Sequence, residues 1–175
     1  MKIASRRPRS GRAEQMAAES AEWVPTGTRE DDLVSAVADS PLFAGMPQAE
    51  VARAVREFDE ARYPSDRRIV LEGQRGCDFF VIVVGTAAVL VDGWRVATLG
   101  PGDFFGEMAV LGDGQRMASV RAESPMHCLV LPNDKLPDLV LAHPRLGVNL
   151  MHSVVRRFTD LNRRRPPPVA EAAGA

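Results

Sequence analysis

Short apolar runs rich in β-branched and aromatic residues, separated by glycines, fill the chain from residue 61 to residue 132 and constrain its fold most. In AAVLVDGWRVATL (87–99), Asp92-Gly93 separates two such runs, and this pair is typical of a two-residue hairpin because glycine tolerates the positive φ of the turn. FFVIVV (79–84) is apolar throughout, as expected of a strand covered on both faces. Six to eight short strands at this spacing predict a β-sandwich or jelly roll.

Helical patterns flank this β-rich region on both sides. Within residues 31–60, DDLVSAVADS and PQAEVARAVREF read as helices, and Pro47 suits a first helical position. Within residues 133–165, NDKLPDLVLAHP predicts a short helix and PRLGVNLMHSVVRRFTDLNRRR a longer one, which Pro166-Pro167-Pro168 ends. The sequence therefore predicts a mainly β fold with helical flanks.

The longer helix carries a narrow apolar seam within residues 144–165. Its members step by four and three residues: Gly147, Met151, Val154, Phe158 and Leu161. Such a seam could pack on the β-roll, on the same helix of a second copy in a homodimer, or over a ligand. The spacing alone leaves these three possibilities open.

The two ends of the chain lack sustained periodicity. Residues 1–30 mix Arg, Ser, Gly and Pro, and we predict that they form a disordered arm. Residues 166–175 are a short segment with mostly small side chains, which we predict to be a disordered tail. The RRPRSGR piece could touch a phosphate backbone, but no aromatic residues interleave with its charges, which favours a solvated tail.

Charge, hydropathy and the rarer residues exclude several kinds of function. The 175 residues carry a net charge of −1, so no overall field would draw the chain to nucleic acid or to an anionic membrane. No apolar run reaches the ~18 residues of a membrane span, and two cysteines alone favour a reducing cytoplasm over a disulfide scaffold. The three histidines show no metal-binding spacing, and no catalytic triad or Cys/His pair is evident, so we predict no enzyme, catalytic residue or metal site.

One stretch, FFGEMAVLGDGQRMASVRA (104–122), places an acid and a base among apolar and small residues. A turn after Gly106 would begin a short helix whose first N–H groups lack intrahelical partners and can face an anion. Arg116 can close on the same anion with two parallel hydrogen bonds, and Glu107 would accept a bond from a sugar hydroxyl. The pair predicts a ligand with one phosphate and a neighbouring hydroxyl.

These residues resemble a known family, the cyclic nucleotide-binding domains of bacterial catabolite activator proteins, protein kinase A regulatory subunits and nucleotide-gated channels. FGEMAVLGDGQRMASVRA (105–122) is similar to the family's phosphate-binding cassette, EGQRGCDFFVIVVGTAAVLV (72–91) to its preceding strands, and SPLFAGMPQAEVARAV (40–55) to its first helices. The resemblance implies one domain over residues 31–165: N-terminal helices, an eight-stranded jelly roll, and C-terminal helices that form a lid. About ten residues follow Arg165, so a stand-alone domain without a DNA-binding part is expected.

The resemblance also implies roles for single residues. Glu107 corresponds to the acceptor for the ribose 2′-hydroxyl, and Arg116 to the residue that binds the cyclic phosphate. The backbone around sugar and phosphate corresponds to Gly106, Met108 and Ala109. Met117 stands where guanine-preferring members commonly have a threonine, so the resemblance favours cAMP over cGMP. Kinase subunits have an acid that supports the arginine at the position of Cys77, and the neighbouring Asp78 is a candidate to replace it.

Two functions from different classes follow. The first is a cytoplasmic cAMP sensor that moves its C-terminal helices on ligand binding and so controls an unidentified protein partner, with Met151, Val155 or Phe158 as candidate lid residues. The second is a structural or interaction module that keeps the fold without filling the pocket, in which Glu107 and Arg116 form an ion pair. An enzyme on a similar barrel lacks metal ligands, and direct binding of DNA is not expected.

Overall fold

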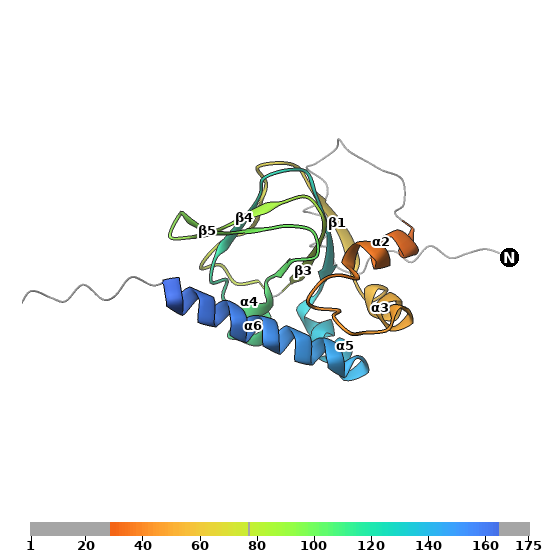
Figure 1. Ribbon diagram of the computed structural model, residues 1–175. Coiled ribbons are helices and arrows are strands. Elements are labelled where there is room, and N and C mark those ends of the chain that lie inside the picture. The colour runs from red at the N-terminus through yellow and green to blue at the C-terminus, as the bar shows by residue number, and fades with distance from the viewer. Residues whose placement is uncertain (1–28, 77, 165–175) are drawn as a thin grey trace, which may run out of the picture.

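The computed structural model describes residues 29–76 and 78–164, and its centre is a roll of two antiparallel four-stranded sheets (Figure 1). The strand orders are β1-β8-β3-β6 and β2-β7-β4-β5. The strands are β1 Asp59–Tyr63, β2 Arg68–Val70, β3 Phe79–Val84, β4 Ala87–Val91, β5 Trp94–Leu99, β6 Phe104–Phe105, β7 Ser119–Ala122 and β8 Met126–Leu131. The predicted mainly β jelly roll with helical flanks is confirmed.

Helices stand before, within and after the roll. They are α2 Glu30–Val37, α3 Gln48–Val55, α4 Glu107–Leu111, the short 3-10 helix η1 Asn133–Lys135, α5 Leu136–Ala142 and α6 Pro144–Arg164. Helix α2 begins at Glu30, so the last residue assigned to the disordered arm is helical. The rest of that arm, apart from residue 29, and the tail at 166–175 lie outside the described residues.

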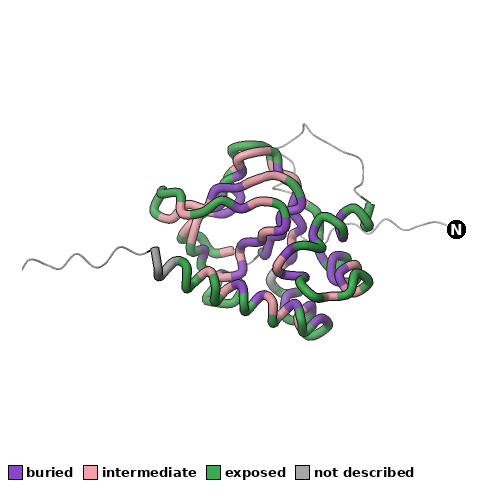
Figure 2. The backbone as a smooth tube through the Cα atoms, in the orientation of Figure 1, coloured by how far each residue is buried: buried purple, intermediate pink, exposed green. Residues whose placement is uncertain are grey.

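Strand β3 is covered on both faces, as its sequence predicts. Phe79, Val81 and Val83 pack into the cluster that the helices share, whereas Phe80 and Ile82 face the interior of the roll. Strand β8 divides in the same way, so the sheet that holds these two strands separates two apolar cores. Figure 2 marks the buried stretches of the backbone in purple. Because β3 packs against both cores, the ends of this strand have fixed positions. The residues of a site can therefore be placed there.

The predicted hairpin between β4 and β5 is also present. Asp92 and Gly93 form its turn with φ values of 51° and 80°, both in the left-handed region that a two-residue turn of this kind requires. Asp92 N donates a hydrogen bond to Glu72 Oε2 over 2.9 Å, which ties the hairpin to the segment after β2.

Helix α6 runs along one side of the roll and passes α4 (Figure 1). Leu146 and Leu150 anchor the first half of α6 in the apolar cluster that the helices share with β3. Asn149 Nδ2 donates hydrogen bonds to the carbonyls of Leu42 and Ala44 over 3.0 and 2.9 Å. The first half of α6 is therefore held by both apolar and polar contacts.

The members of the predicted α6 seam differ in burial: Met151 and Phe158 are exposed, so packing of the seam on a second copy stays a prediction. A Cβ on Gly147 would lie 2.6 Å from Val140 Cγ1, so this residue packs on α5, and Val154 is half-buried. The side chain of Leu161 lies outside the described part. The apolar residues that the helix exposes are Val148, Met151, Val155 and Phe158.

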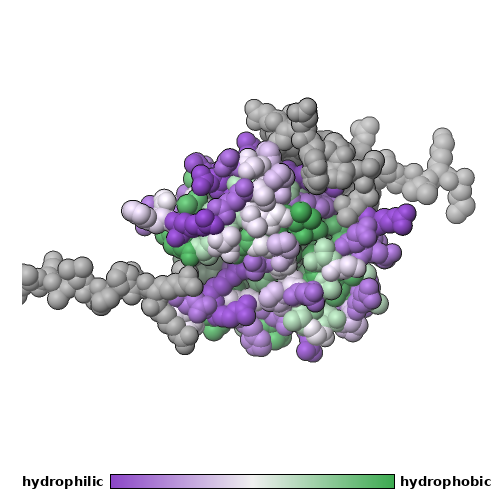
Figure 3. All heavy atoms as spheres, turned by 45° about the horizontal axis from the view of Figure 1, so that its top comes forward, coloured by the Kyte–Doolittle hydropathy of each residue, from purple (hydrophilic) through white to green (hydrophobic). Residues whose placement is uncertain are grey.

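The surface mixes hydrophilic and hydrophobic residues on the face in Figure 3, in keeping with the near-zero net charge. Among residues 29–76 and 78–164, no helix is both long and apolar enough to cross a membrane.

Candidate functional site

Gly106, between β6 and α4, sets the geometry of the candidate site. Its φ is +92°, and a Cβ there would lie 2.5 Å from the carbonyl oxygen of Asp78 and 2.8 Å from Arg116 Nη1. Real Cβ atoms do not approach other atoms this closely, so only glycine lets the chain turn into α4 against the residue that precedes β3.

Arg116 lies under this turn and is only 7% exposed. Its Nη1 donates to the carbonyl of Gly106 over 3.3 Å and its Nη2 to the carbonyl of Asp78 over 3.0 Å, and Cζ lies 5.9 Å from the ring centroid of Phe80. Gly76 makes room on another side, because a Cβ there would lie 3.2 Å from Arg116 Nε. Asp78 thus contacts the arginine through its backbone carbonyl, and Cys77 lies outside the described residues.

A cavity of about 420 Å³ opens beside Arg116. The residues that line it are Glu72, Gly73, Asp113, Gln115, Arg116 and Met117. Met117 is 60% exposed and stands at the cavity without filling it. The residue that carries the buried guanidinium therefore also lines this opening.

The side chain of Glu107 does not line this cavity. Its side chain is 4% exposed, and its Oε1 accepts a hydrogen bond of 2.7 Å from Nη1 of Arg157, which extends from α6. Arg157 Cζ also lies 4.4 Å from the ring centroid of Phe104. Glu107 is not among the residues that line the cavity, so the arginine end of the site is open and the acid end is covered by α6.

The structure thus brings Arg116 and Met117 to one cavity, and Gly106 contacts Arg116 through its backbone carbonyl. In α4, the helix that Glu107 begins, Ala109 is buried and Met108 half-buried. The candidate lid residues Met151, Val155 and Phe158 are all exposed on the outer side of α6.

Arg157 of α6 contacts Glu107 of the cassette, and the sequence analysis missed it. It lies on the helix face that Leu146, Leu150 and Ser153 bury, at steps of four, three and four residues. A helical period of 3.6 residues, counted from the two leucines rather than from Gly147, would have found it.

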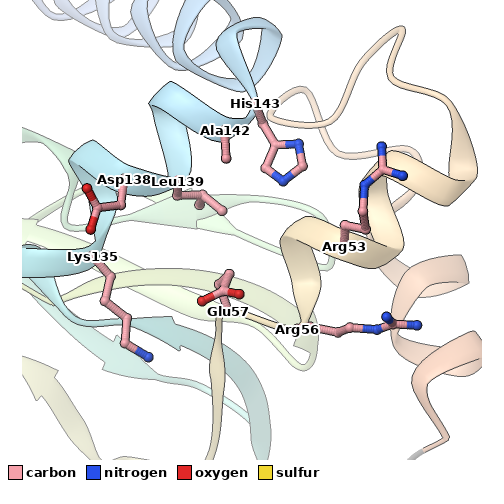
Figure 4. Close-up of a pocket in the computed structure, with 8 residues that line it drawn as sticks. All are labelled: Arg53, Arg56, Glu57, Lys135, Asp138, Leu139, Ala142 and His143. Carbon is pink, nitrogen blue, oxygen red and sulfur yellow. The ribbon is translucent and has the colours of Figure 1, made fainter.

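A larger cavity, of about 700 Å³, lies between α3 and α5 (Figure 4). Its lining mixes charges of both signs: Arg53, Arg56, Glu57, Lys135, Asp138, Leu139, Ala142 and His143. Arg56 is paired with Glu30 over 2.7 Å, and His143 Nδ1 lies 3.2 Å from Glu50 Oε1. The smaller cavity is the candidate functional site, because Arg116 of the cassette lines it.

Two titratable groups in the interior of the roll have raised pKa values, which do not suit them to acid–base or nucleophilic catalysis. Burial raises the pKa of the Cys128 thiol to about 12 and also raises the pKa of Tyr63, so both groups stay protonated. Within residues 29–76 and 78–164, no three His, Cys, Asp or Glu side chains gather in a way that could hold a metal ion.

Comparison with known proteins adds the family. The model of the cyclic nucleotide-binding domain matches residues 60–143, which contain the β-roll, α4, Arg116 and α5. These residues form a domain of the cyclic nucleotide-binding family. The predicted limits of the domain, 31 and 165, stay predictions.

Similar proteins differ in their overall function. The cyclic AMP receptor protein of Thermus thermophilus is 31% identical over 126 residues, 69% of this chain and 58% of that protein. A cGMP-dependent protein kinase of Toxoplasma gondii is 40% identical over 83 residues, 47% of this chain and 8% of the kinase. The crystal structure of the Thermus thermophilus catabolite activator protein is 30% identical, with a TM-score of 0.67 over 70% of this chain and 60% of that chain.

The chain thus spans less than two thirds of the length of these relatives. The kinase activity belongs to a protein of which the aligned part is 8%, so it is not carried over. What this chain shares with these relatives is the cyclic nucleotide-binding domain.

Proposed function

We propose that this domain binds a cyclic nucleotide, preferably cAMP, and transmits binding to a protein partner through α6. The observation that carries the proposal is Arg116 of the family's cassette: its buried guanidinium donates to two backbone carbonyls, and the residue lines a cavity of about 420 Å³. A charged donor with several N–H groups suits a phosphate better than a neutral ligand.

Each cassette residue has a proposed part in binding. Arg116 binds the cyclic phosphate, and the backbone of Met108 and Ala109 at the start of α4 adds N–H donors. Glu107 accepts a hydrogen bond from the ribose 2′-hydroxyl, once its carboxylate is accessible to the sugar.

The preference for cAMP rests on Met117. This residue lines the cavity and has no hydroxyl to offer to a guanine, which favours adenine. The relatives named above include proteins of both kinds, one named for cyclic AMP and one for cGMP. A titration must therefore decide between the two nucleotides.

The test is calorimetric titration and thermal unfolding with cAMP, cGMP and, as a control ligand, linear AMP. We expect binding of cAMP, and loss of about 100-fold or more in affinity in Arg116→Ala, since two charged hydrogen bonds contribute ~1.5–3 kcal/mol each. Arg116→Lys keeps the charge and tests whether the parallel bonds matter. Arg121→Ala, on the exposed part of β7, is the matched control.

A structural module that never fills the pocket is the alternative, and one observation favours it. Glu107 is already satisfied by Arg157, so the acid end of the site needs no ligand for stability. If millimolar cAMP and cGMP leave the unfolding temperature of the wild-type protein unchanged, this alternative replaces the sensor.

We further propose that a second copy of the chain is one partner of α6. The four exposed apolar residues Val148, Met151, Val155 and Phe158 step by three, four and three residues, the spacing of a two-helix seam. We expect dimers in analytical ultracentrifugation, and monomers in Phe158→Glu but not in the exposed control Thr159→Glu. A wild-type monomer at ~100 μM, above the Kd of a micromolar dimer, would contradict this part.

The site of action that we propose is the cytoplasm. The free thiol of Cys128 is buried in the roll and fits a reducing compartment.

A further inference from the structure

The larger cavity, between α3 and α5, shares no lining residue with the cavity beside Arg116. Its volume of about 700 Å³ lies within the ~300–1,000 Å³ that is usual for pockets that hold organic ligands. Figure 4 shows residues of α5 on one side of the opening and residues of α3 on the other. Leu139 and Ala142 supply apolar surface, and the three cations of the lining outnumber its two acids. An occupant should therefore combine an apolar side chain with negative charge.

The described part of the chain starts at the rim of this cavity. Residue 29 is the first described residue, and Glu30, at the start of α2, pairs over 2.7 Å with Arg56, which lines the cavity. The residues that precede Arg29 are therefore attached beside the opening. Trp23 lies six positions before Arg29, and an extended chain spans about 3.3–3.6 Å per residue, so Trp23 can reach about 20 Å from this attachment.

One stretch before residue 29 has the composition that the cavity requires. Residues 19–25, ESAEWVP, contain two acids and no basic residue. Trp23, in the same stretch, is the only aromatic residue among residues 1–28. The cations of the lining complement the two carboxylates, and a guanidinium or ammonium group is attracted to the face of an indole ring. Charge and apolar surface thus point to the same segment.

We propose that residues 19–25 dock into the cavity between α3 and α5 of the same chain, with Trp23 against Leu139 and Ala142. Docking within one chain needs little intrinsic affinity, because a short flexible link gives an effective concentration in the millimolar range. A segment with a Kd of ~0.1 mM would then be docked in about 90% of the molecules. Such docking is compatible with the low periodicity of the arm, since a disordered segment can become ordered on binding. It does not depend on nucleotide binding.

The fluorescence of Trp23 tests the proposal. The chain has two tryptophans, and the other, Trp94, is 78% exposed on β5, so Trp94→Phe leaves Trp23 as the only one. Emission spectra and acrylamide quenching are measured for the full-length Trp94→Phe protein and for a synthetic peptide of residues 17–28. We expect the protein to emit at a shorter wavelength than the peptide and to be quenched at least about threefold more weakly, because docking shields the indole ring in most molecules.

Two changes to the cavity, made in the Trp94→Phe protein, should expose Trp23. Ala142→Phe fills part of the opening and should bring emission and quenching to the values of the peptide. Arg53→Glu reverses a charge of the lining and should shift both toward those values. Both residues are exposed, so the core is unchanged. The matched controls, Leu141→Phe on α5 and Arg121→Glu on β7, change exposed residues outside the lining and should leave Trp23 shielded.

The outcomes distinguish the possible occupants of the cavity. Shielding of Trp23 that is equal at ~1 and ~100 μM protein, and that the two cavity variants reduce, supports docking within one chain. Emission and quenching equal to those of the peptide would overturn the proposal. Shielding that both cavity variants leave unchanged would also overturn it, since Trp23 would then lie elsewhere. Shielding only at the higher concentration would assign the docked segment to a second copy and exclude docking within one chain.

Discussion

The substitution Gly106→Ala tests whether the site depends on the close approach of the Gly106 backbone to Asp78 and Arg116. The new methyl group would lie 2.5 Å from the carbonyl oxygen of Asp78 and 2.8 Å from Arg116 Nη1, at a φ of +92°. Relief requires that the turn before α4 moves away from the residue before β3, since a backbone carbonyl cannot rotate aside as a flexible side chain can. We therefore expect a loss of both stability and ligand affinity.

The magnitude follows from two separate costs. A left-handed φ costs an alanine about 1–2 kcal/mol, and overpacking adds about 1–3 kcal/mol, for a total of about 2–5 kcal/mol. Gly93 isolates the first cost, because its φ is +80° and a Cβ there would meet nothing within 4 Å. Gly93→Ala should therefore lose only about 1–2 kcal/mol.

Denaturant unfolding of the wild type and the two variants measures both values, and titration with cAMP measures the effect on the site. Gly106→Ala should be the less stable variant and should bind at least about tenfold more weakly, because the same shift displaces the carbonyl that holds Arg116. Equal losses of stability in the two variants would refute the reasoning from close approach.

Three further predictions concern groups away from the cavity. Burial and the neighbouring Arg62 lower the pKa of His127, so the native state binds fewer protons than the unfolded chain, and stability should fall as pH drops below about 6.5. His127→Gln should flatten this dependence in denaturant unfolding at a series of pH values. The Cys128 thiol, with a pKa of about 12, should resist a thiol reagent at neutral pH until the protein unfolds, as measured in a Cys77→Ser background. Asn149→Ala should cost about 1–3 kcal/mol in thermal unfolding, because the buried carbonyl of Leu42 loses its donor.

Local patterns explain why so much of the fold could be predicted. The Asp92-Gly93 turn and the apolar run of β3 depend on backbone conformation and on burial of both faces, which neighbouring residues encode. The cassette could be found for the same reason, since Gly106, Glu107 and Arg116 lie within eleven consecutive residues. Spacing could not tell which apolar stripe of α6 meets the core, and the structure buries Leu146 and Leu150 there while Met151 and Phe158 are exposed.

The sequence by itself determined the roll, its hairpin and the residues of the cassette, because each is specified by conformational preferences over a few positions. The tertiary structure alone decided that Glu107 pairs with Arg157 while Arg116 lines the cavity. These two residues of the cassette lie nine positions apart, but the partner of Glu107 is fifty positions further along the chain. Only the packing of α6 on the roll brings that partner to it, so the division of the site into an open and a covered end is a property of the folded molecule.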